Sequence, residues 1–180
     1  MVRRVVRAII NLAALAFALD RVLGRLRGGR APEPLRMLVE VNASIEETWA
    51  IIADIQLQLA WMVEMREVRI TTPGPTGVGT KGEATVRIAG ISVTDPVEVV
   101  EFQPPHRYAI RHAGLFTGGG LITLEAGADG QTTTVRWEET LIPPILPELG
   151  ALVQAPILRS IFQGDLARLK RLVETGSADA

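Results

Sequence analysis

The chain has 180 residues, of which 47% are hydrophobic and 22% charged, which is typical of one globular domain with room for an appendage. It has no cysteine and two histidines, so disulfide frameworks, thiolate zinc sites and cysteine nucleophiles are excluded, and we expect neither a metal nor a cofactor. A net charge of -1 and an aromatic content of 4% argue against a nucleic-acid partner.

Residues 1–30 form a basic segment, which we call the arm. Its seven arginines against Asp20 give +6, which leaves -7 for the rest of the chain. Apolar residues recur in the arm at steps of three and four, as on one face of a helix: Val2, Val5, Ile9, Leu12, Ala16, Leu19, Leu23 and Leu26. Gly28, Gly29 and two prolines then end the helix, and residues 31–34 are predicted to be a linker.

Four interpretations of the arm stay open. A helix in the interface of an anionic membrane fits best, because its apolar face would enter the headgroup boundary while arginines meet the lipid. We then expect membrane contacts from Arg3, Arg4, Arg7, Ile9, Leu12, Phe17, Arg21 and Arg25. The alternatives are a helix docked on its own domain or on a second copy, a signal peptide ending near Ala16-Phe17-Ala18, and a membrane span. The uncharged run over 8–19 disfavours a span, because it covers roughly 18 Å against about 30 Å of hydrocarbon.

The body of the chain opens with a strand and a capped helix. Residues 35–41 alternate as a half-buried strand does. Ser44 and Glu47 have the spacing of a capping box, which predicts a helix through Ile55 and a second short helical stretch up to Trp61.

Six strand candidates follow, separated by turns rich in proline and glycine. They cover residues 63–72, 79–88, 91–102, 106–112, 115–125 and 132–142. The short loops between them favour an antiparallel meander over units with crossover helices.

The end of the chain is predicted to be helical, with one or two turns over 146–154 and a new helix that begins at Pro156. Residues 176–180 are expected to be a disordered tail. This order of elements predicts an α+β fold, in which a curved antiparallel sheet of about seven strands wraps around the C-terminal helix. One helix cannot fill the concave face, so we expect an apolar cavity between sheet and helix.

Four short motifs in the body appear in an order that resembles a known superfamily. They are Val41-Asn42-Ala43-Ser44-Ile45-Glu46-Glu47-Thr48-Trp49, the turn at 77–80, the strand start at 102–108 and the hairpin at 130–135. Together with Asp54 and Trp61, they resemble the START-like (SRPBCC) superfamily over residues 35–174, and most closely its polyketide cyclase/dehydrase-like branch. The resemblance implies a helix-grip domain over 35–175 with a hydrophobic cavity. It also implies relatives that carry lipids, sterols, hormones or quinones, or that catalyse cyclisation or dehydration.

Eight side chains are expected to line that cavity: Trp61, Tyr108, Ile110, His112, Phe116, Trp137, Glu139 and Phe162. His112 is the best catalytic candidate, because imidazole exchanges protons near neutral pH. The alternatives are a surface histidine beside Arg111 and a hydrogen-bonding group that orients a ligand. Carboxylates in the strands, Asp95 among them, are generally expected to point into solvent. Glu139 is the exception, because alternation places it on the same strand face as Trp137.

Two further features are read from their residue types. The run over 118–120 lacks the lysine and the helix of a phosphate-binding loop, so it predicts either a bend or close backbone approach in the strand, or a flexible cavity mouth. Asp165 interrupts the apolar face of the last helix, where it could meet Arg111 or Arg136, hydrogen-bond a ligand or be solvated.

Three functions are compatible with these patterns. We favour a binding module that holds a lipid or another hydrophobic small molecule, with the arm on a membrane. An enzyme of cyclase or dehydratase type is the second hypothesis, and a module that self-associates through the arm is the third. The expected location is the cytoplasm, peripherally at the inner face of the membrane, and an exported form is left open.

Overall fold

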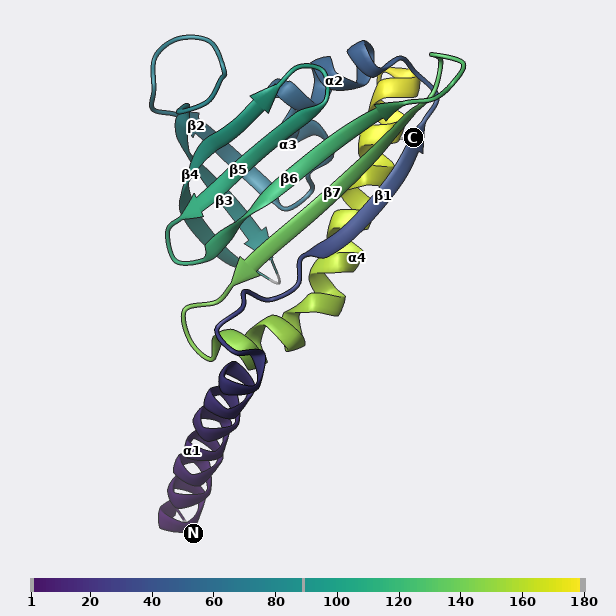
Figure 1. Cartoon of the computed structure of the whole chain (residues 1–180). Coiled ribbons are helices and arrows are strands. Elements are labelled where there is room, and N and C mark those ends of the chain that lie inside the picture. Colours follow the sequence, from purple (N-terminus) through teal and green to yellow (C-terminus); the bar gives the residue numbers. More distant parts are fainter. Residues whose placement is uncertain (1, 89, 179–180) are drawn as a thin grey trace.

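Figure 1 shows the computed structural model of the chain, which describes residues 2–88 and 90–178. The helices are α1 (Val2–Arg27), α2 (Ile45–Ala53), α3 (Gln58–Trp61) and α4 (Pro147–Thr175). The strands are β1 (Leu35–Val41), β2 (Met65–Ile70), β3 (Lys81–Ile88), β4 (Ile91–Gln103), β5 (Arg107–Ala113), β6 (Thr117–Ala126) and β7 (Thr133–Ile142). The predicted strands therefore agree with the structure to within two residues at each end.

The seven strands form one antiparallel sheet in the order β1-β7-β6-β5-β4-β3-β2. Strands β2 to β7 are a meander in which each strand pairs with the next, and β1 joins the sheet by pairing with β7. The long helix α4 runs along the sheet beside β1 and β7, while α2 and α3 cover one end (Figure 1). The predicted α+β helix-grip architecture is confirmed.

The core lies between one face of the sheet and the helices. In β7 the alternate residues Thr133, Val135 and Trp137 are buried, as expected for a strand with one solvated face. Leu166 and Leu169 of α4 are completely buried in the same core. Each buried leucine stabilises the fold by about 1.5–3 kcal/mol relative to an exposed one, so this helix face anchors α4.

Helix α2 begins at the predicted capping box. The Glu47 N–H donates to the Ser44 side chain, and the Glu47 carboxylate accepts from the Ser44 N–H at 3.0 Å. These reciprocal bonds satisfy two backbone donors that the first helical turn would otherwise leave unpaired.

Helix α4 is one continuous helix, so the predicted break before Pro156 is wrong. Proline removes the N–H that would bond to the Leu152 carbonyl, but Leu152 is exposed, and water can take over that carbonyl. At the other end, Gly176 ends the helix with a positive φ of 76°. In the predicted disordered tail, Ala178 is buried, and residues 179–180 lie outside the described part.

Helix α1 projects away from the body over most of its length (Figure 1). The described residues up to Leu15 are all exposed, and only positions spaced by three or four residues beyond them are covered: Ala16, Asp20, Leu23, Gly24 and Arg27. None of the described helices has both the length and the apolarity that crossing a bilayer requires. The docked interpretation therefore describes the C-terminal part of α1, whereas the rest has no cover from its own domain.

Candidate functional site

A buried polar cluster lies on the helix-facing side of the sheet and joins β5 to β7. The Trp137 indole N–H donates to Glu139 Oε2 at 2.9 Å, and His112 Nε2 lies 3.0 Å from Glu139 Oε1. Glu139 is only 3% exposed. Because a carboxylate only accepts, Nε2 of His112 is the donor in this contact. The cluster thus combines a fixed carboxylate with an oriented imidazole.

Glycines in β6 make this contact across two strands possible. In the sheet register Gly120 lies between Ile110 and Glu139, and Gly118 lies between His112 and Leu141. A Cβ at residue 120 would come within 2.4 Å of Glu139 Oε2. With no side chains on β6 at these two positions, His112 and Glu139 can meet over the strand.

The glycine run is therefore a region of close backbone approach, which was one of the two predicted interpretations. Gly118 has a φ of +119°, and a Cβ there would lie 2.1 Å from the Thr140 carbonyl oxygen. A Cβ on Gly119 would lie 2.3 Å from the carbonyl oxygen of Ile110. Any side chain at these positions would push β5 or β7 away from β6.

Aromatic side chains fill the centre of the space between sheet and α4. The Trp61 and Trp137 rings pack edge to face at 6.1 Å, and Trp137 packs on Phe162 at 4.7 Å. Such pairs add about 0.5–1.5 kcal/mol each beyond their area burial. Five of the eight predicted cavity residues thus belong to the core or pack against it: Trp61, Tyr108, Ile110, Trp137 and Phe162.

The larger free space, about 240 Å³, lies where α1, the linker, β7 and the first half of α4 meet. We call it the arm-root cavity; its walls are Arg27, Pro32, Glu33, Leu35, Glu139, Thr140, Leu141, Ala151, Leu152, Gln154 and Ala155. The walls are mainly apolar, and Glu139 connects them to the polar cluster. The arm-root cavity therefore combines apolar walls with charged groups, namely Arg27, the exposed Glu33 and the buried Glu139.

A second, smaller space lies under β2 to β5 beside α3. Tyr108 and Ile110 are among its walls, and its volume of about 30 Å³ holds only one or two water molecules. Burial raises the pKa of the Tyr108 phenol, and a hydrogen bond with Gln58 opposes that shift. This space cannot hold a lipid without moving its walls.

The arm is fixed at the rim of the arm-root cavity by its single carboxylate. Asp20 is buried and accepts from the backbone N–H groups of Glu148 and Leu149, both at 2.9 Å. It caps the N-terminus of α4 from another helix, and it thereby satisfies two of the backbone N–H groups that have no partner within the first turn of a helix. Arg27 adds an ion pair with Glu148. The position of α1 thus depends on charged contacts with α4.

Two other aspartates, Asp95 and Asp165, are buried, although strand and helix carboxylates are generally expected to be solvated. Asp95 is buried and accepts from the backbone of Leu115 at 2.8 Å, so it holds the β5–β6 turn beside the half-buried Phe116. Asp165 is buried and accepts from the Val63 N–H at 3.0 Å. Burial raises the pKa of Asp165 to about 7; the Val63 hydrogen bond opposes the shift and nearby Glu64 adds to it.

The predicted partners of Asp165 lie elsewhere. Arg111 pairs with Glu98 at 2.6 Å, and Arg136 lies 3.5 Å from Glu125. Sequence reasoning did not assign the roles of Asp20 and Asp95. Both carboxylates bond to backbone N–H groups of distant segments, and no spacing rule reveals such a contact.

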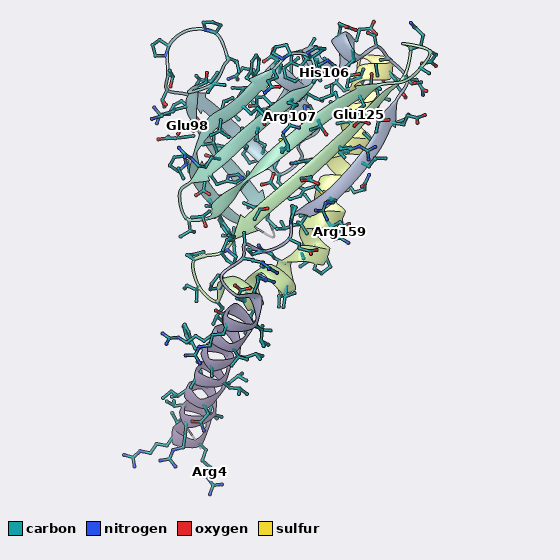
Figure 2. All side chains as sticks on the ribbon, in the orientation of Figure 1. Arg4, Glu98, His106, Arg107, Glu125 and Arg159 are labelled. Atoms are coloured by element: carbon teal, nitrogen blue, oxygen red, sulfur yellow. The ribbon has the colours of Figure 1, made fainter. Side chains whose placement is uncertain are left out.

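The side chains predicted to contact a membrane are all exposed on α1: Arg3, Arg4, Arg7, Ile9, Leu12, Phe17, Arg21 and Arg25. Figure 2 shows Arg4 near the free end of α1, pointing away from the body. Large apolar side chains accompany the arginines along the whole helix: Val2, Val5, Val6, Ile9, Ile10, Leu12, Leu15, Phe17, Leu19, Val22 and Leu26.

Comparison with known proteins agrees with this architecture. A protein from Thermus thermophilus is 16% identical over 80% of this chain and 99% of its own, with a TM-score of 0.65. The Zhui aromatase/cyclase from Streptomyces sp. R1128 is 17% identical over 79% of this chain and 96% of its own, with a TM-score of 0.61. A protein of the dynemicin biosynthetic locus is 21% identical over 82% of this chain but only 49% of its own, with a TM-score of 0.57.

These solved structures, at such low identity, show the fold alone. No curated protein matches the chain. The profile of one family, described as polyketide cyclase / dehydrase and lipid transport, matches residues 35–174, which is nearly all of the body and none of the arm. A family of that description suggests a hydrophobic small molecule as ligand. The chain belongs to the polyketide cyclase/dehydrase and lipid transport family.

Proposed function

We propose that the chain binds a lipid or another hydrophobic small molecule in the grip between sheet and α4, and that the arm holds it at an anionic membrane surface. The arm-root cavity carries the binding proposal, because it is a partly apolar space of about 240 Å³ beside α4 and β7. Its 240 Å³ is below the 300–1,000 Å³ of drug-sized sites, so it suits a small ligand or one end of a longer one. Burying about 200 Å² of apolar ligand surface would supply about 5 kcal/mol before the costs of association.

The exposed surface of α1 supports the membrane part of the proposal. Its apolar side chains would enter the headgroup boundary, and each arginine near an anionic surface contributes about 1 kcal/mol. Six of the seven arm arginines lie away from the ion pair that Arg27 makes with Glu148. Their charge is therefore available to lipid phosphates.

Native mass spectrometry of the full chain tests the binding part. We expect protein purified without detergent to carry a bound mass that organic extraction removes and that returns on incubation with a lipid extract. Repeated spectra of empty protein under all three conditions would overturn the binding proposal. The measurement does not involve vesicles, so it does not depend on attachment to a membrane.

Flotation with vesicles tests the membrane part. The full chain should float with vesicles of phosphatidylglycerol and phosphatidylcholine, and the triple variant Arg3→Gln, Arg4→Gln, Arg7→Gln should float about a hundredfold less, given about 1 kcal/mol for each charge. Arg36→Gln, an exposed arginine of the body, is the matched control. Sedimentation without vesicles tests whether the arm serves self-association instead. A dimer that is lost when residues 1–30 are deleted would support that interpretation.

The polar cluster supports an enzyme as the second candidate. A dehydratase must remove a proton and return one to the departing hydroxyl, and His112 fixed by Glu139 has the orientation that general acid–base catalysis needs. Water loss from β-hydroxyacyl thioesters tests this. We expect turnover that falls 10²–10⁴-fold in His112→Ala but not in the control His106→Ala. Undiminished turnover in His112→Ala would remove the catalytic role of His112.

A further inference from the structure

We infer that Glu139 is the polar anchor of the ligand: a hydroxyl group of the ligand donates to its carboxylate, while the hydrocarbon part leaves through the arm-root cavity toward α1. The inference rests on the proposed binding function and adds the chemical class and the orientation of the ligand. Three observations carry it, namely the hydrogen-bonding of Glu139, the nature of the walls and the position of the arm.

The Glu139 carboxylate has unused acceptor capacity, and the residue lines the arm-root cavity. Its two oxygens offer about four lone-pair sites, and the structure shows one donor on each, Trp137 Nε1 and His112 Nε2. Glu139 Oε2 occupies the place that a side chain on Gly120 would take, and Glu139 is one of the residues that line the cavity. A ligand group at this point can therefore add a hydrogen bond without displacing either partner.

The chemistry of the site selects a hydroxyl group. A carboxylate or phosphate end has no donor for Glu139 and would be repelled by its charge. An ammonium end would carry a full charge into mainly apolar walls, which costs more than burying a neutral hydroxyl. An alcohol or phenol satisfies the carboxylate at the lowest desolvation cost.

The walls set the direction in which the rest of the ligand lies. Leu35 pairs with Glu139 in the sheet, and the chain before Leu35 brings Pro32 of the linker into the wall, while Ala151, Leu152 and Ala155 line it from α4. Leu152 is 55% exposed, so the cavity opens at its end. Arg27, at the end of α1, lies at the same end. A ligand anchored on Glu139 therefore has its tail directed to the base of the arm, the side proposed to face the membrane.

Indole resonances provide a direct test. The chain has three tryptophans, so a ¹⁵N–¹H correlation spectrum of the full chain shows three indole N–H signals, and Trp137→Phe identifies the one bonded to Glu139. The probe is 1-decanol, and decyl methyl ether, which keeps the chain and the oxygen but cannot donate, is its matched control. We expect 1-decanol to move the Trp137 signal but not that of Trp49, which packs on Phe102, and to bind at least fivefold more tightly than the ether.

Two variants locate the occupied space. Ala151→Phe narrows the cavity and should weaken 1-decanol binding at least tenfold, whereas Val153→Phe, on an exposed face of the same helix, should leave it within twofold. Equal binding of alcohol and ether, or unchanged binding in Ala151→Phe, would overturn the anchor while leaving hydrophobic binding intact. Native mass spectra that stay empty with every lipid would instead overturn the proposed function itself.

Discussion

The arm and the helix-grip domain are both rich in apolar residues, but those of the arm are mostly exposed to solvent, whereas those of the domain are packed in its core. Leu166 and Leu169 of α4 are completely buried, whereas Leu12 and Leu15 of α1 are 68% and 65% exposed. The helix-grip domain covers its apolar core with its own elements, because the seven-stranded sheet and α4 form two apolar layers that pack on each other. A single projecting helix has no second layer, so its apolar side chains can be covered only from outside the domain.

Helix α4 joins these two regions. Its second half supplies the buried leucines, while its first half carries the exposed Leu152 and Val153, receives the Asp20 cap and forms a wall of the arm-root cavity. Stability should therefore depend strongly on the second half, whereas the position of the arm and access to the cavity should depend on the first half. The predictions below test this division.

Leu169→Ala should have the largest effect. Removing a fully buried leucine from the core leaves a cavity and costs about 2–5 kcal/mol in the free energy of unfolding. Leu152→Ala, on the exposed first half of the same helix, should cost under about 1 kcal/mol. Urea unfolding of both variants measures this difference. Equal losses in the free energy of unfolding would contradict the different roles assigned to the two halves of α4.

Asp165 should make the stability of the second half depend on pH. Its pKa is raised to about 7 in the folded protein from an ordinary value near 4, so folding favours the protonated form. The resulting stabilisation is fully present below about pH 4 and is lost as the pH rises through about 7. On the order of 2 kcal/mol should disappear in urea unfolding between pH 5 and pH 8.

Asp165→Asn provides the comparison for that pH effect. The amide oxygen can still accept from the Val63 N–H, but the side chain no longer ionises. The variant should therefore show a smaller loss of stability with rising pH than the native chain. An identical pH profile for the two proteins would show that another group causes the dependence.

Gly120→Ala should test the polar cluster. The added Cβ would lie 2.4 Å from Glu139 Oε2, so the carboxylate must move, at a cost of about 1–3 kcal/mol. Gly164→Ala is the matched control, because nothing lies within 4 Å of its Cβ in α4, and alanine there should stabilise by about 0.5–1 kcal/mol. A neutral Gly120→Ala would mean that Glu139 is not held in this position.

Asp20→Ala should have the smallest effect on the body. It removes a cap from α4, which costs about 1 kcal/mol, and it frees the arm. We expect faster trypsin cleavage after Arg27 and Arg30, with little change in the melting temperature of the grip. Asp20→Asn, whose amide oxygen still accepts, should behave more like the native chain. Unchanged cleavage in Asp20→Ala would show that the arm is held by other contacts.

Alternation, turn residues and the capping box were enough to predict the strands and the start of α2. They depend on neighbours in sequence, and such local patterns determine where elements begin and end. Pro156 shows the limit: proline is typical of a helix start, yet α4 continues through it, where the exposed Leu152 lets water replace the missing hydrogen bond.

The polar cluster could be predicted only in part. Alternation placed Glu139 on the face of Trp137 and His112 on that of Tyr108, but bringing the two together required the register of β5, β6 and β7. The glycines were the available signal, because two vacant positions on one face of β6 allow its neighbouring strands to share a contact. The Asp20 cap gave no such signal, since it links residues 128 positions apart.

A crystal structure of the full chain grown with 1-decanol tests the central claim most directly. The account predicts electron density for the alcohol in the arm-root cavity, with its oxygen within hydrogen-bonding distance of Glu139 and its chain passing Ala155 toward Pro32. Density for the alcohol only on the outer surface of the protein, with the cavity closed by its own side chains, would contradict it.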